Sequence, residues 1–116
     1  MRLTHLAAIA LLCGLPGIAQ AHHGWSSYDA QKTLTIDAPL TSLRWANPHS
    51  AATINYEGKS WDVVLAPVTR MEARGLSEAM LKPGNKLTLV GYPRSDGTRE
   101  MRIERVVLDG KTYELR

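Results

Sequence analysis

Residues 43–50 read LRWANPHS, and the rest of the chain is organised around this stretch. Trp45 ends a run in which apolar and polar residues alternate, which is the period of a half-buried strand. Asn47 and Pro48 then predict a turn, because asparagine can hydrogen-bond the backbone two residues on and proline pre-sets φ at the second turn position. His49 is the only histidine after residue 23. The stretch therefore predicts a chain reversal and holds the first residue to consider for chemistry.

Alternation of apolar and polar residues continues on both sides of this turn. Pro39 interrupts the run before it, since proline cannot donate to a strand ladder, so we expect one long bent strand or two short ones. Pro67 fits the first turn of a short helix, where its missing N–H costs nothing, and Gly75 suits the helix C-terminus. The predicted strands are 32–45, 52–56, 61–65, 86–91 and 101–107, with a short closing strand over 112–115.

The order of three strands, one helix and two strands predicts an all-β fold with one short helix. Among such folds we expect a five-stranded OB-like Greek-key barrel, in β-β-β-α-β-β order, as a single domain over residues 32–116. An antiparallel sandwich is the main alternative, although a lone helix at that place in the order is harder to explain there.

An OB-like barrel uses the loops after its first and fourth strands for ligands. These loops are residues 45–50 and 93–98, and we expect them to converge at one mouth of the barrel. For His49 the alternative is a structural role in the turn, with its ring capping backbone groups or packing on Trp45. The expected ligand-binding residues are Trp45, Asn47, His49, Arg94 and Asp96.

Charged residues alternate along the predicted strand 101–107 and just before it. Glu100, Arg102 and Glu104 face outward, and because charged faces are mostly solvated surface we interpret them as cross-strand pairs. The tryptophans of two neighbouring strands fall at inward positions and are interpreted as core. Trp25 is not placed by the pattern.

The first 21 residues are predicted to be a cleaved signal peptide that exports the protein to the periplasm. Arg2 gives a positive start, residues 6–15 form an apolar run, and Ala19-Gln20-Ala21 is a small-x-small cleavage site. A membrane anchor is the alternative, but the run is shorter than the roughly 20 residues that a spanning helix needs. The only cysteine, Cys13, lies in this leader, so the mature domain is expected to have no disulfide.

Leader removal would create a possible metal site at the new amino terminus. Cleavage after Ala21 starts the chain at His22-His23, and cleavage after Ala19 places His22 third. Amine, imidazole and deprotonated amide nitrogens suit copper(II), with His49 as a further ligand if the arm folds back. Residues 22–31 are expected to form a flexible arm, and the alternative to copper binding is that its histidines hold no metal in the cell.

Several short motifs resemble one family. The histidine pair behind the leader, the W-x-N-P-H turn at residues 45–49 and the Gly-Tyr-Pro of residues 91–93 are similar to those of small exported bacterial proteins known only as a domain of unknown function. The resemblance covers nearly all of the mature chain. It implies export and a single domain, and it adds no activity.

These observations favour a periplasmic, non-enzymatic binding module for a small ligand or an envelope partner protein, with copper(II) binding as the alternative. Catalysis is not favoured, because the mature chain lacks a cysteine nucleophile and its body holds one histidine. Nucleic acid is not expected as a partner, since the net charge is only +3 and aromatic and basic residues are not interleaved. No transmembrane segment is expected after the leader.

Overall fold

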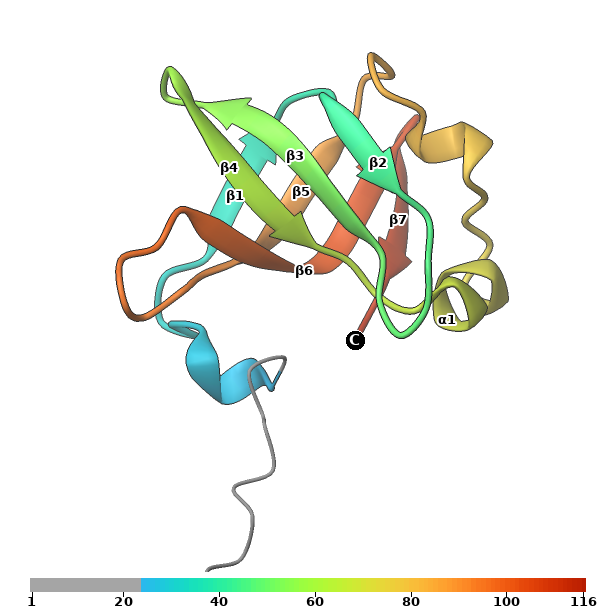
Figure 1. The fold of residues 1–116 in the computed structure, drawn as a ribbon. Coiled ribbons are helices and arrows are strands. Elements are labelled where there is room, and N and C mark those ends of the chain that lie inside the picture. Colours follow the sequence, from blue (N-terminus) through green and yellow to red (C-terminus); the bar gives the residue numbers. More distant parts are fainter. Residues whose placement is uncertain (1–23) are drawn as a thin grey trace, which may run out of the picture.

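The structure is a computed structural model that describes residues 24–116 (Figure 1). The predicted leader, and with it His22 and His23, lies outside the described residues. The described part is mostly β, with one short α-helix, so the predicted all-β class is confirmed. Its strands are β1 (Leu34–Asp37), β2 (Ser42–Arg44), β3 (Ala51–Tyr56), β4 (Lys59–Val64), β5 (Thr88–Pro93), β6 (Glu100–Leu108) and β7 (Lys111–Glu114). Its helical elements are the α-helix α1 (Val68–Ala73) and single 3-10 turns η1 (Trp25–Ser27) and η2 (Ala79–Leu81).

The strands form one sheet in the order β1-β5-β6-β4-β3-β2, with β7 paired to β6. The pairs are antiparallel except β4 with β6, which run parallel. The predicted five-stranded closed barrel is therefore wrong, because the described sheet has seven strands and its path of hydrogen bonds runs from β1 to β2 without closing.

The break in the predicted first strand explains part of this difference. Residues 38–41 leave the ladder around Pro39, which has no N–H to donate. The strand segment before the break pairs with β5 and the segment after it with β3. The two-strand alternative for residues 32–45 is thus the one observed. The predicted position of the helix, between the strands β4 and β5, is also confirmed.

A bulge in β6 sets which of its residues face the core. Val90 pairs with Arg105, but Gly91 pairs with Ile103, so Glu104 is the extra residue. Met101 and Ile103 are buried before the bulge, and the inward phase then moves to Val106 and Leu108. Val107 is therefore only partly buried, because alternation along the strand is interrupted by one residue.

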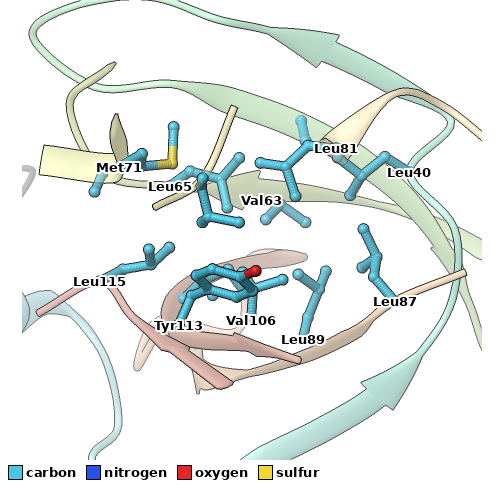
Figure 2. Packing of buried hydrophobic residues seen from close by; sticks show 14 of the residues in the cluster. Leu40, Val63, Leu65, Met71, Leu81, Leu87, Leu89, Val106, Tyr113 and Leu115 are labelled. Atoms are coloured by element: carbon cyan, nitrogen blue, oxygen red, sulfur yellow. The ribbon is translucent and has the colours of Figure 1, made fainter. Parts of the chain in front are cut away.

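The core fills the space between the inner faces of the curled sheet and the helical segment (Figure 2). Met71 of α1 is completely buried and lies at the same end of the core as Leu65 and Leu115. Trp45 and Trp61 pack against this core but remain partly exposed, so they line its margin rather than fill it. Within residues 24–116, none of the helices has the length and apolar character to cross a membrane.

Candidate functional site

The predicted turn at residues 45–50 is present, and its polar groups are used to attach it to the start of α1. The Asn47–Pro48 peptide bond is cis. The Asn47 side chain accepts a hydrogen bond from the backbone N–H of Val68 at 3.0 Å. This N–H has no partner within its own helix, so Asn47 satisfies an otherwise open donor. Asn47 therefore has a structural role in this turn.

Ser50 holds the other side of the turn. It is completely buried, and its hydroxyl donates to the Ala46 carbonyl at 3.2 Å and accepts from the Ala46 N–H at 3.1 Å. Its backbone N–H donates to the Ala66 carbonyl at 2.9 Å. His49 is half-buried, with Nδ1 3.4 Å from the Ser50 carbonyl oxygen. The imidazole thus lies against the backbone of its own turn.

The other predicted loop is engaged with different partners. The Arg94 guanidinium pairs with Asp96 at 3.2 Å and with Glu100 at 3.3 Å. Asp96 also accepts from the Thr98 N–H at 2.9 Å, and this bond, with Arg94 beside it, holds the pKa of Asp96 below its ordinary value. Both charged residues are therefore neutralised by neighbours within or next to their own loop.

The two loops are not brought together. Residues 45–50 lie against α1, whereas residues 93–99 lie at the opposite side of the sheet in Figure 1. A hollow of about 340 Å³ is lined by Tyr56, Trp61 and Arg94 among others, and it contains none of the other predicted ligand-binding residues. The expected convergence at one mouth is thus not observed, because each loop is anchored to a different part of the fold.

The N-terminal segment before β1 is docked on the sheet, although the sequence predicts a flexible arm there. Tyr28 is buried and donates from its phenol to the Glu100 carboxylate at 2.7 Å. Burial, reinforced by this bond to Glu100, raises the pKa of Tyr28 well above its ordinary value. Backbone bonds from Asp29 to Pro93 and from Ser95 to Ser27 complete the attachment.

This docking places Trp25 over two arginines. The guanidinium carbon of Arg102 lies 4.3 Å from the Trp25 ring centroid, and that of Arg116 lies 4.5 Å from it. Tyr92 contacts the same indole edge-on, with ring centroids 6.2 Å apart and planes at 79°. We call Trp25, Tyr92, Arg102 and Arg116 the arginine–tryptophan cluster. It joins the N-terminal segment, two central strands and the C-terminal end of the chain.

Arg102 is the residue whose bonding is incomplete. Its Nη1 atom is buried and has no hydrogen-bond partner among the described residues. No carboxylate of residues 24–116 lies within ion-pair distance of it, even though Glu100 and Glu104 flank it on the same face of β6. Burial lowers the pKa of Arg102, and repulsion from Arg70 and Arg116 lowers it further.

The flanking glutamates are occupied by other donors. Glu100 is bound by Tyr28 and Arg94. Glu104 accepts a hydrogen bond from the Tyr92 phenol at 2.8 Å and lies 3.6 Å from Arg116. The pairing expected for these glutamates is therefore present, but Arg102 between them has no counter-charge among residues 24–116.

The α-helix adds a further positive charge to this region. Arg70 donates from Nη1 to the carbonyl of Leu115 at 3.4 Å, which brings its guanidinium to the C-terminal segment. Arg74 donates to the Arg116 carbonyl at 3.3 Å. Arg70 of α1 therefore lies close enough to repel Arg102, whereas Arg102 and Arg116 are the arginines that contact the indole of Trp25.

Sequence reasoning found Arg102 and its outward direction but not its environment. Strand alternation shows which face a residue occupies, whereas the return of Trp25 onto that face depends on tertiary contacts. The burial of Tyr28 and its bond to Glu100, 72 positions along the chain, have no local sequence signal.

The predicted metal ligands are only partly covered by the structure. His22 and His23 lie outside the described residues, so their geometry is not part of the site. Within residues 24–116, no group of three or more histidine, cysteine, aspartate and glutamate side chains is arranged to hold a metal ion. A site that includes His49 would need its other ligands from residues before 24.

The described part of the chain is a small β module with one sheet and one α-helix. On it, Trp25 covers two arginines, Arg102 and Arg116, which form the candidate site. The chain belongs to the family described as "Family of unknown function (DUF6152)", which it matches over residues 10–102. The matched range includes Trp25 and Arg102 and ends before β7 and Arg116. A search among curated proteins gives no match.

Proposed function

We propose that this protein is a periplasmic, non-enzymatic module that binds a small ligand or an envelope partner protein at the arginine–tryptophan cluster. The single observation that carries this proposal is the buried, unpartnered Nη1 of Arg102. A buried donor without an acceptor costs about 1–3 kcal/mol, and more when the group is charged. An acceptor supplied by a bound molecule would recover that cost, so the folded protein has a thermodynamic reason to bind one.

The turn at residues 45–50 is the weaker candidate for the same function. Asn47 and Ser50 are committed to hydrogen bonds that attach the turn to the core. Removing them would disturb folding before it revealed a ligand. In contrast, the guanidinium groups of Arg102 and Arg116 attach Trp25 of the N-terminal segment and pair with Glu104, and within residues 24–116 no strand pairing depends on them.

The test is an NMR binding screen with the isotope-labelled full-length protein and fractionated envelope extract. We expect an active fraction to shift the indole N–H signal of Trp25, assigned with Trp25→Phe, together with backbone signals of β5 and β6. Arg102→Met should abolish these shifts, whereas His49→Ala should preserve them. Shifts confined to residues 45–50, or binding that survives Arg102→Met, would overturn the assignment of the site.

Copper(II) binding by the processed amino terminus is the alternative function. Trp25 is held on the sheet by the cation–π contacts, and His22 and His23 directly precede that anchored segment. The free amine of His22 and the two imidazoles would form a nitrogen-rich donor set suited to copper(II). This alternative requires export and cleavage at the predicted site, which mass spectrometry of the amino terminus checks.

A further inference from the structure

We infer that the group recognised at the arginine–tryptophan cluster is a single oxyanion, a carboxylate or a phosphate, carried by a small ligand. The inference rests on the proposed function, because it names the chemistry of the molecule bound at that same surface. It follows from the geometry of the guanidinium groups, the local excess of positive charge and the two glutamates that border the cluster.

The cation–π contacts with the indole do not occupy the N–H groups of the two arginines, although Nη1 of Arg116 also lies 3.6 Å from Glu104. Trp25 contacts the guanidinium carbons of Arg102 and Arg116 at 4.3 and 4.5 Å, which is the range of cation–π contacts. Such contacts use the aromatic ring and the cation without consuming N–H donors. The planar donor fork of a guanidinium matches the paired oxygens of a carboxylate or phosphate. An aromatic platform with two arginines therefore suits an oxyanion better than a neutral polar group.

The charge balance favours an anion. Arg102 has no ion-pair partner among the described residues, and Arg70 and Arg116 are close enough to repel it. The nearest acidic side chains are engaged by Tyr28, Tyr92 and other arginines. A neutral ligand would satisfy one donor but leave the repulsion, whereas an anion would satisfy the donor and reduce the repulsion together.

The glutamates beside Arg102 limit how much negative charge a ligand can bring to the cluster. Glu100 and Glu104 stand two positions before and after Arg102 on the same strand. A nucleic acid or an acidic protein surface would bring further negative charge against these glutamates. One oxyanion placed between the arginines avoids that repulsion. The Arg116 side chain, which is 54% exposed, leaves an approach from solvent.

The experiment titrates the isotope-labelled full-length protein with inorganic phosphate, acetate and the neutral analogue acetamide at constant ionic strength. We expect phosphate and acetate to shift the Trp25 indole and Arg102 side-chain signals, with a dissociation constant on the order of 1 mM for so small an anion. Acetamide should cause no saturable shift. Phosphate binding without acetate binding would assign the group to a phosphate, and the reverse would assign it to a carboxylate.

Three variants separate specific recognition from general charge. Arg102→Met should weaken anion binding about 10- to 100-fold, because it removes a charge-assisted donor pair. Arg102→Lys keeps the charge but loses the fork, so it should bind more weakly than the wild type and more tightly than Arg102→Met. Arg99→Met is the matched control: Arg99 is exposed, and within the described chain its side chain makes no hydrogen bond or ion pair. It should bind within about twofold of the wild type, because Arg99 stands three residues before Arg102, roughly 10 Å along an extended chain, and salt screens charges beyond roughly 8 Å.

Two results would overturn the inference. One is an Arg99→Met loss as large as that of Arg102→Met, which would indicate non-specific attraction. The other is that the wild type shows no saturable anion binding. Matching circular dichroism spectra of the wild type and Arg102→Lys would confirm that the proteins tested are folded. If an envelope fraction still shifted the Trp25 and Arg102 signals in that case, the proposed function would stand and only the oxyanion would be wrong.

Discussion

Replacing Gly91 with alanine tests the strand register that places Arg102 on the outer face of the sheet. Gly91 is buried in β5 opposite Ile103, at the step where the pairing with β6 shifts by one residue. An added Cβ would lie 2.8 Å from the carbonyl carbon of Arg102, nearer still to its oxygen, and 3.0 Å from the Cα of Ile103. All of these are backbone atoms, so no side-chain rotation can relieve the overlap.

The two strands must therefore separate locally in Gly91→Ala. Overpacking costs typically about 1–3 kcal/mol, and each ladder hydrogen bond that weakens adds about 0.5–1.5 kcal/mol. We expect the free energy of unfolding to fall by about 3–4 kcal/mol in total. Since 1 kcal/mol shifts Tm by about 4–8 °C in a domain of this size, Tm should fall by roughly 12 °C or more.

The measurement is urea denaturation followed by circular dichroism, with Gly97→Ala as the control. Gly97 has φ +83°, and an added Cβ there meets no atom within 4 Å. Its substitution therefore carries only the cost of a left-handed backbone, about 1–2 kcal/mol. If Gly91→Ala is no more destabilising than Gly97→Ala, the close approach of β5 to the bulge in β6 is refuted.

Three further predictions concern the turn, the N-terminal segment and the amino terminus. Asn47→Ala removes the acceptor for the Val68 N–H and should lower the free energy of unfolding by about 0.5–2 kcal/mol, measured by urea denaturation; an unchanged value would contradict the capping role. Tyr28 has a pKa raised in the folded state by burial and by Glu100, so its contribution to stability is complete below the ordinary tyrosine pKa of 10.0 and is lost as pH rises above that value. Urea midpoints should therefore fall less between pH 9 and pH 11 in Tyr28→Phe than in the wild type, and equal falls would contradict the assignment. Correctly processed protein should bind copper(II) more tightly than an amino-blocked form in a micromolar titration, and equal affinities would exclude the terminal chelate.

The strands were predictable because most of them carry one buried and one solvated face. Ala52 and Ile54 are buried between more exposed neighbours, which is the alternation that predicts β3. The alternation is incomplete in β4, where Val63 and Val64 are both buried. The break at Pro39 was also predictable, because it depends on a covalent property of proline. These features are local, so the sequence reports them directly.

The bulge in β6 was not predictable from alternation. The alternation of inward and outward residues along β6 changes phase at Glu104. The reason lies on β5, where Gly91 has no side chain and so lets the backbone of β6 approach closely. Neither residue signals the shift by itself. The count of strands and the open path of the sheet were missed for a related reason, because pairing partners are decided by the whole fold.

The two loops of the expected ligand site could be predicted from the sequence, but their separation in space could not. The five expected ligand-binding residues occupy turns, as predicted, but the two turns have separate anchors: Asn47 on α1, and Arg94 on Glu100. Arg102 was correctly placed outward and then interpreted as a solvated pair. Only the structure shows that its two candidate partners on β6, Glu100 and Glu104, already accept hydrogen bonds from tyrosines.

The arginine–tryptophan cluster depends on the same contacts that dock the N-terminal segment. Tyr28 binds Glu100, which is two positions from Arg102 on β6, and Trp25 lies three residues before Tyr28. Releasing Tyr28 would therefore move the indole away from the arginines without altering any charge in the cluster. The guanidinium groups would then lose a cation–π contact worth about 0.5–2 kcal/mol. If the proposed oxyanion binds the arginines more tightly with the indole in place, ligand affinity and docking of the segment are thermodynamically coupled. Such coupling is reciprocal, so an oxyanion that binds the arginines with the indole in place must also favour the docked segment.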